Sequence, residues 1–524
     1  MEVTLSNWLF SLSPLVLFLY LMIGKKWSGS KASFTSWIYT LIIAVLFFGA
    51  NLPLIGYAHF KTIFLAGDVL FIIWMALYFF HISNSAGAVS VLGNALSNLT
   101  SNKVIQALLL SWLFTSFLQG LGGFGVPVAV TAPLLISIGI NPIDAVVMAS
   151  LGHGWAVTFG SMGSSFQTLM ALSDYSGYVL APDTAILLGG AAVISGLLIA
   201  HIHSGFKGIL RNLVFILAIG LILGGVQYFL AVNGLWTVAA TGAAMTALCA
   251  AFLFIKITHA AKDKYKPSII KAEDDPNKSS QPSLTLSSSV YIILVLLSFL
   301  IKLVTPLNDM LSGIKLAYLF PEITSNLGWV TPSEYGRVIT LFTHPGTILL
   351  AASIIAYFLY QKKHFLNAEK RKEIFLNVRN SGLRTSIAIF FTVSITVIMS
   401  HTGMIHILAK GLSAVVSAEL YPALTPFIGA LGAFISGSNN NSNILFTQLH
   451  MQTAQLMDLD VTLILAAQSA GGAIGSIFAP AKVIIGCSTV GLAGKEGLVL
   501  GKIIKYGILL VTFIALCTSI LAKQ

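Results

Sequence analysis

The sequence predicts an all-α polytopic membrane protein of about 11–14 transmembrane helices. We expect two pseudo-symmetric repeats with broken or re-entrant helices. Three observations lead to this fold class. Of 524 residues, 56% are hydrophobic and only 9% are charged, whereas soluble domains carry roughly 25% charged residues. Long apolar runs recur along the chain, and glycine-rich polar clusters interrupt two apolar regions at corresponding places.

Apolar runs long enough to cross a bilayer as helices, about 17–25 residues, define the expected spans. In chain order these lie near residues 7–24, 34–51, 63–82, 104–118, 184–203, 209–231, 234–256, 288–305, 345–360, 385–400 and 500–521. The regions 119–170 and 420–495 are apolar but interrupted. The number of full crossings in these two regions is therefore left open.

Positive charge is concentrated in short loops between the expected spans. The formal net charge is +11, and loops rich in Lys and Arg stay cytoplasmic. We therefore expect loop 302–344, which is nearly neutral, and the N-terminus outside, and the basic loops inside: 25–33, 204–208, 257–287 and 361–384. A lipid bilayer is the partner that this distribution indicates, and it does not indicate nucleic acid.

One polar, Pro- and Ser-rich segment divides the chain. We expect an N-terminal membrane half (1–256), a cytoplasmic linker (257–287) and a C-terminal membrane half (288–524). Shifting the chain by 317 positions places the FLQG of residues 117–120 on the FISG of residues 434–437. In both halves an apolar helix ends at a glycine-rich polar cluster, a short helix and an acidic loop follow, and a second apolar helix ends at a second cluster. This common order predicts the repeat.

The polar clusters predict a binding site inside the membrane. Irregular backbone survives in hydrocarbon only when it is buried in protein or lines an aqueous cavity. Paired, glycine-interrupted segments in two halves are typical of a transporter's substrate site. The plainer alternative is that small residues only cap and pack helix ends. The predicted substrate-binding residues are Gln119, Gly120, Gly122, Gly123, Gly125, Ser438, Asn439, Asn440, Asn441, Ser442, Asn443, Gly471, Gly472 and Ser476.

The stretch FLQGLGGFGVPVAVTAPLL (117–135) resembles a signature of the bacterial lactate permease family. Further similar motifs follow in the family's order: AVTFGSMG (156–163), GSNNNSN (437–443), Gly471-Gly472 with Gly475 and Pro480, and VGLAGKE (490–496). The resemblance implies a divergent member of the family in the cell inner membrane. It implies a secondary transporter of a lactate- or glycolate-like 2-hydroxy monocarboxylate, coupled to H⁺ and without enzymatic activity or cofactor.

Three charged positions of the family pattern are neutral in this chain. Gln119 stands in place of Glu, Asn439 in place of Asp, and Ser476 in place of Lys. Gln and Asn do not titrate, so other residues must carry a coupled proton. The coupling candidates are His153, Asp68 and Arg384, of which the last two occupy similar places in the two halves and are candidates for a pair. Lys482 is a candidate replacement for the missing lysine.

Other functions remain open at this stage. Neutral amides, hydroxyls and backbone oxygens also suit Na⁺, so transport of another organic anion by Na⁺ coupling or exchange is an alternative. An ion channel would need a repeated filter sequence, which the chain does not show. An intramembrane enzyme would need paired acids or a zinc motif such as HExxH, and neither occurs. We predict no metal site, and the sequence leaves the oligomeric state undetermined.

Overall fold

The computed structural model describes residues 3–25, 27–123, 125–260, 281–335, 338–492 and 495–523. The described N-terminal half contains α1 (Leu5–Ile23), α2 (Gly29–Phe48), α3 (Leu52–Ser85), α4 (Ala88–Ser97), α5 (Lys103–Leu108), η1 (Leu109–Phe114), α6 (Thr115–Leu121), α7 (Val126–Ser137), α8 (Pro142–His153), η2 (Gly154–Ala156), α9 (Gly160–Ser173), α10 (Gly177–Val232) and α11 (Ala239–Ala260). Residues 261–280, most of the predicted linker, lie outside the described residues. The division of the chain there stays a prediction.

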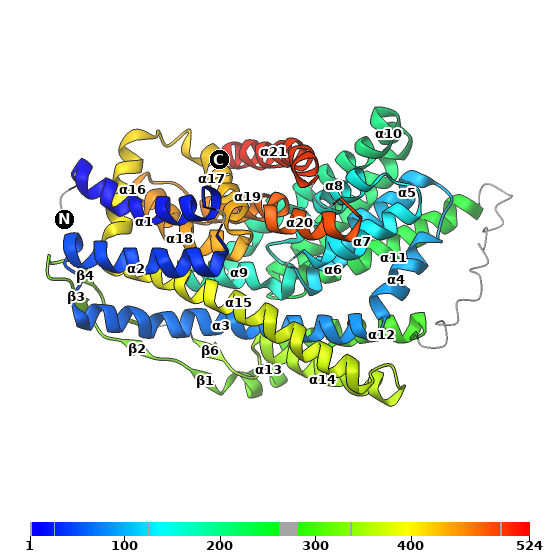
Figure 1. Ribbon diagram of the computed structural model, residues 1–524, viewed down its shortest axis with the longest axis horizontal. Coiled ribbons are helices and arrows are strands. Elements are labelled where there is room, and N and C mark those ends of the chain that lie inside the picture. Colours follow the sequence, from blue (N-terminus) through cyan, green and yellow to red (C-terminus); the bar gives the residue numbers. More distant parts are fainter. Residues whose placement is uncertain are drawn as a thin grey trace.

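The C-terminal half continues with helices and three small hairpin-like pairings. Its helices are α12 (Leu284–Leu303), α13 (Thr305–Ser312), α14 (Pro345–Lys362), α15 (Ala368–His401), α16 (Met404–Val415), α17 (Tyr421–Ser436), α18 (Asn439–Leu456), α19 (Val461–Gly475), η4 (Ser476–Phe478), α20 (Pro480–Thr489) and α21 (Glu496–Leu521). Six two-residue strands pair antiparallel as β1–β6, β2–β5 and β3–β4: Lys315–Leu316, Leu319–Phe320, Ile323–Thr324, Val330–Thr331, Glu334–Tyr335 and Ile339–Thr340. These strands run along α3 toward the end where α1 and α2 lie (Figure 1).

The prediction of an all-α polytopic membrane protein is confirmed. The described part of the chain holds ten helices that are long and apolar enough to cross a membrane, besides four shorter apolar helices. The longest, α10, breaks at Ser204 and Gly205, where the glycine has φ 61° and ψ −160°. Its two arms meet so closely that a Cβ on Gly189 would lie 3.2 Å from the Cα of Gly224. This one element therefore supplies both spans predicted at 184–203 and 209–231.

The two halves repeat one order of elements. Helices α3 and α15 both contain 34 residues and begin at Leu52 and Ala368, 316 positions apart. Residues in the left-handed backbone conformation occur at matching places in both halves. Because such residues commonly end helices, the helices of the two halves end at matching places as well. These matching residues are Gly49 and His364, Gly87 and Gly403, Gly125 and Gly437, Gly139 and Asp458, and Asp174 and Gly491.

The halves are interleaved rather than side by side. Helix α2 packs on α15, and its counterpart α14 packs on α3. In the same reciprocal way α9 packs on α18 and α20 on α7, and α10 packs on α19 and α21 on α8. Helices α1 and α2 lie along one end of α3, whereas α12 and α14 lie toward its other end (Figure 1). These contacts between the halves come in reciprocal pairs, as expected for an approximate two-fold arrangement.

Glycines bring the helices of the C-terminal core into backbone contact. A Cβ on Gly471 would lie 2.0 Å from the carbonyl oxygen of Pro426, and one on Gly475 would lie 2.1 Å from that of Ala430. Small residues permit such close approach between membrane helices. The structure thus places Gly471, a predicted substrate residue, in the crossing of α17 and α19.

Candidate functional site

Two helix breaks come at corresponding places in the halves. In the first, α6 ends at Leu121 and α7 begins at Val126, with Gly125 at φ 88° as its N-cap. In the second, Gly437 at φ 75° ends α17, and the extended Ser438 precedes α18. Phe124 in the first break lies outside the described residues. Each break leaves the start of a short helix, α7 or α18, inside the protein, where free N–H groups favour negative charge.

A third break lies inside α9. Ser161, Met162 and Gly163 have φ values of 46°, 56° and 72°, all in the left-handed region. For residues other than glycine this conformation costs roughly 1–2 kcal/mol each. The turn aims the serines that follow it toward α18, since Ser165 Oγ donates a hydrogen bond to Asn440 Oδ1. These serines are not among the site residues that the sequence predicts.

The breaks line a small, partly open cavity. Its walls come from both halves, so neither half forms it alone. The polar groups on these walls belong to Gln119, Ser161, Ser164, Ser165, Ser438, Asn439, Asn440 and Lys482. A second, larger and partly open cavity shares Ser438, Asn440 and Lys482 with the first and adds Ser28, Arg384 and Asn441. We call the two together the central cavity.

Lys482 supplies a buried positive charge to the central cavity. The residue is only 8% exposed, and its Nζ donates a hydrogen bond to Ser476 Oγ at 3.1 Å. It lines both parts of the central cavity, and no Asp or Glu belongs to the described lining of either part. A buried charge is costly unless it is paired. The central cavity is therefore suited to an anion.

The asparagine cluster divides into residues that hold the fold and residues that face the cavity. Asn443 Nδ2 donates to Ser165 O at 2.8 Å and to Ser469 Oγ at 3.2 Å. Ser442 Oγ donates to Gly429 O at 2.7 Å. Both residues are fully buried and absent from the described cavity lining. Their contacts fix α18 against α9, α17 and α19.

Asn439, Asn440 and Asn441 lie at the cavity wall. Asn439 Nδ2 donates to Thr158 Oγ1 at 3.0 Å, which ties the second break to the segment between η2 and α9. The amide oxygens of Gln119, Asn439 and Asn441 are buried and have no hydrogen-bond partner among the described residues. Each amide oxygen can accept a hydrogen bond from a hydroxyl group of a ligand. If the amide group is flipped, its NH2 group can instead donate a hydrogen bond to an anion.

The remaining predicted glycines have mainly packing contacts. A Cβ on Gly120 would lie 2.3 Å from Thr241 Oγ1, so Gly120 brings α6 against α11. Gly122 faces Phe80 of α3, and a Cβ on Gly472 would lie 2.2 Å from Asn439 Oδ1. Gly123 is the exception, because it lines the cavity between Gln119 and Ser161.

The three coupling candidates occupy different places. His153 is buried, and its Nδ1 donates to Ala149 O at 2.8 Å. Asp68 on α3 lies 2.7 Å from His344 Nε2, and both side chains are almost completely buried. Arg384 on α15 lines the central cavity beside Ser28. His344 and Ser28 are the N-caps of α14 and α2, so Asp68 and Arg384 each face the start of a helix from the other half.

Comparison with known proteins identifies the family. The model of the L-lactate permease family matches residues 7–523. The L-lactate permease of Bacillus subtilis is 25% identical over 541 residues, covering 97% of this chain and 94% of that protein. The L-lactate permease of Escherichia coli K12 is 24% identical over 558 residues (98% and 96%), and the glycolate permease GlcA of the same organism is 21% identical over 542 residues (98% and 95%).

Two solved transporters show a low overall similarity in structure. The Alcanivorax borkumensis YdaH transporter has a TM-score of 0.43 and 12% identity, covering 86% of this chain and 84% of that one. The antimetabolite efflux pump MtrF of Neisseria gonorrhoeae has a TM-score of 0.44 and 14% identity, covering 86% and 81%. The family model, by contrast, spans nearly the whole sequence. The chain belongs to the L-lactate permease family.

Proposed function

We propose that this protein is a secondary transporter of a small 2-hydroxy monocarboxylate, such as lactate or glycolate, across the cell inner membrane. The names of its relatives, L-lactate permease and glycolate permease, support this substrate class. The basic linker 257–287 and loop 361–384 would then lie in the cytoplasm, by the distribution of Lys and Arg.

The buried ammonium of Lys482 is the observation that carries the proposal. A carboxylate bound beside this buried side chain would form a charge-assisted hydrogen bond with it. The amides and serines of the central cavity are neutral donors and acceptors for the 2-hydroxyl group. Lys482 reaches Ser476, the position at which the family pattern has its lysine. Lys482, six residues after Ser476, would thus supply the ammonium group that the family pattern has at the position of Ser476.

The interleaved halves provide a means of alternating access. Helices α7 and α18 begin beside the central cavity, one from each half, and their N-terminal ends favour an anion. In the proposed transport cycle, the core helices of the two halves would exchange positions relative to α3 and α15. The substrate would remain at the shared cavity while access to it alternates.

We assign proton coupling to Asp68 and His344. Gly346 N donates to His344 Nδ1 at 3.1 Å, so His344 Nε2 carries the proton that is donated to Asp68 Oδ1. An additional proton on Asp68 would remove the charge that this hydrogen bond stabilises. The contact between α3 and the start of α14 would then weaken, which links protonation to the packing of the two halves.

Asp68→Asn should uncouple transport. We expect accumulation of labelled lactate, driven by an imposed H⁺ gradient, to fall to the level set by simple equilibration. Exchange of internal for external lactate should persist, because the central cavity is unchanged. Both quantities are measured in proteoliposomes. Asp183→Asn is the matched control, since Asp183 accepts a hydrogen bond from Thr462 Oγ1, lies outside the described lining of the central cavity and should leave accumulation intact. Continued accumulation by Asp68→Asn would contradict the assignment.

Uptake into proteoliposomes tests the function itself. Labelled lactate, glycolate and pyruvate are offered with H⁺ and Na⁺ gradients imposed separately, and saturable uptake with counterflow is expected. Absence of saturable uptake for every 2-hydroxy and 2-oxo acid would refute the proposal. Dependence on Na⁺ alone would favour the alternative coupling, in which the buried amide oxygens of Gln119, Asn439 and Asn441 hold the cation.

A further inference from the structure

The larger part of the central cavity has room for a whole substrate molecule. Its free volume is about 240 Å³. A cavity of roughly 150 Å³ already holds benzene, and lactate has no more non-hydrogen atoms than benzene. Residues at the start of α2 and on α15, α17, α18 and α20 form its walls, and its polar lining includes Ser28, Arg384, Asn441 and Lys482. We call this part the Arg384 cavity.

The Arg384 cavity runs from the surface of the protein to the buried Lys482. Ser28 and Arg384 are exposed, whereas Asn441 and Lys482 are only 5% and 8% exposed. Lys482 and Ser438 also line the smaller part of the central cavity. A solute that enters past Arg384 therefore reaches Lys482 without leaving the cavity.

Arg384 and Asn441 provide partners for a carboxylate and for a hydroxyl group. No Asp, Glu, Lys or Arg follows Arg384 in α15, and no Asp or Glu belongs to the described lining of this cavity. A guanidinium binds a carboxylate through two parallel hydrogen bonds. Asn441 Oδ1 is buried and has no hydrogen-bond partner among the described residues. A hydroxyl group that donates to this oxygen removes the cost of leaving it unpaired.

The equivalent junction in the other half of the chain is closed. Ser28 lies 316 positions before His344, and Asp68 lies 316 positions before Arg384. Asp68 and His344 are joined by a hydrogen bond of 2.7 Å and are 2% and 5% exposed. Ser28 and Arg384 instead border a cavity. Of these two equivalent junctions, one is therefore closed and the other leaves room for a ligand.

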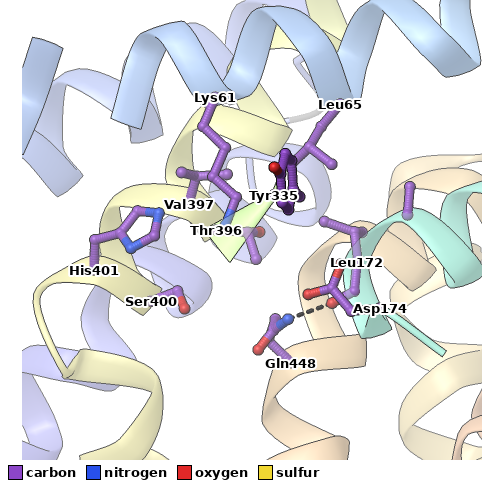
Figure 2. A pocket seen from close by; sticks show the side chains of 11 residues that line it. Lys61, Leu65, Leu172, Asp174, Tyr335, Thr396, Val397, Ser400, His401 and Gln448 are labelled. Atoms are coloured by element: carbon purple, nitrogen blue, oxygen red, sulfur yellow. Dashed lines mark hydrogen bonds between the residues drawn. The ribbon is translucent and has the colours of Figure 1, made fainter. Parts of the chain in front are cut away.

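The far end of α15 has no room for the substrate. Figure 2 shows Lys61 of α3 near His401 of α15, and both line a space with a free volume of about 30 Å³. Beside it Gln448 Nε2 donates a hydrogen bond to Leu172 O, which ties α18 to α9. Along α15 and α18, the substrate therefore fits at the Arg384 cavity and not at this far end.

We infer that the Arg384 cavity is an entry and release site for the transported 2-hydroxy monocarboxylate on the cytoplasmic side. This inference rests on the proposed function and adds a second position for the same substrate. Arg384 binds the carboxylate and Asn441 accepts a hydrogen bond from the 2-hydroxyl group, before the carboxylate passes to Lys482. The basic loops 25–33 and 361–384 contain lining residues of this cavity, so the cavity faces the cytoplasm by the distribution of Lys and Arg.

Ser28→Cys, in a chain whose Cys249, Cys487 and Cys517 are replaced by alanine, reports on occupancy of the Arg384 cavity. Inside-out and right-side-out membrane vesicles are treated with a membrane-impermeant maleimide, and the rate of labelling is measured. We expect rapid labelling in inside-out vesicles only. Lactate should slow this labelling in a saturable way, whereas lactamide, which has no carboxylate, should not. Lactate uptake by the same vesicles shows that the reporter protein is folded.

Arg384→Gln in this reporter should raise the lactate concentration that gives half-maximal protection about tenfold, as for the loss of a hydrogen bond to a charged group. This concentration does not depend on the labelling rate itself, so the effect of the arginine charge on the reagent cancels. Arg384→Lys keeps the charge and should raise the concentration less. Arg379→Gln is the matched control, because Arg379 is exposed on the same helix and lies outside the described lining of the central cavity.

Three outcomes would overturn the inference in vesicles that still take up lactate. These are labelling that lactate does not slow, labelling from the outer face only, and half-maximal protection at an unchanged lactate concentration in Arg384→Gln. Protection that is lost in Lys482→Gln but unchanged in Arg384→Gln would show that the substrate binds at Lys482 alone, and is an instance of the third outcome. Wild-type vesicles without saturable lactate uptake, together with a reporter that lactate does not protect, would instead refute the proposed function.

Discussion

Lys482→Gln should strongly weaken the apparent affinity of the transporter for lactate. The substitution removes the positive charge from the central cavity and leaves a neutral donor of similar length. A hydrogen bond to a charged group contributes roughly 1.5–3 kcal/mol, so the apparent affinity should fall roughly 10- to 150-fold. The measurement is the concentration dependence of initial uptake in proteoliposomes that contain equal amounts of reconstituted protein.

The effect of Lys482→Gln must come from the cavity and not from a change in net charge. Lys505→Gln, an exposed lysine on the neighbouring helix α21, changes net charge equally and should transport normally. Lys482→Arg keeps the charge but changes its shape, and we expect partial activity. A Lys482→Gln protein that takes up lactate with wild-type affinity would show that the carboxylate binds elsewhere.

Gly471→Ala should strongly destabilise the folded protein. The added methyl group would lie 2.0 Å from the carbonyl oxygen of Pro426, and the nearest three atoms all belong to backbone. Overpacking typically costs about 1–3 kcal/mol when side chains can move. Here α17 or α19 must shift as a whole, so the cost should lie at or above that range. We expect a lower yield of monodisperse protein in detergent and a lower melting temperature.

Gly501→Ala provides the matched control for this prediction. Gly501 lies within α21, and no atom lies within 4 Å of the position that its Cβ would occupy. Alanine also favours helix by about 1 kcal/mol over glycine. The control should therefore be as stable as the wild type or slightly more so. A Gly471→Ala protein with wild-type thermal stability and full transport would show that the α17–α19 crossing is looser than described.

Much of the fold follows from the sequence because hydrophobic length and glycine position are local signals. The hairpin of α10 agrees with two predicted spans, and Gly125 and Gly437 are found at helix breaks with positive φ. The interleaving of α2 with α15 and of α14 with α3 could not be predicted, because it depends on contacts between residues hundreds of positions apart. Periodicity within one helix carries no information about its distant partner.

Prediction of the site from the sequence is limited in the same way, because the role of a residue depends on its contacts with distant parts of the chain. The sequence indicated which clusters are polar, but Asn443 and Asn440 are identical in type and only their surroundings separate a packing role from a cavity role. His344, the partner of Asp68, lies at the end of a long neutral loop that gave no signal in the sequence. The left-handed turn at Ser161 and Met162 is likewise invisible to propensity, since neither residue favours that conformation.

The reciprocal contacts of α3 and α14 also constrain how the protein is made. Ser85, at the end of α3, is synthesised 260 residues before Pro345, where α14 begins. Translation proceeds at about 5–20 residues per second, so roughly 13–52 seconds pass between the synthesis of the end of α3 and the synthesis of the start of α14. During this interval Asp68 has no access to His344. Insertion therefore has to proceed through temporary neighbours, either lipid headgroups, water or the insertion machinery, and the final pairing is completed only late in translation.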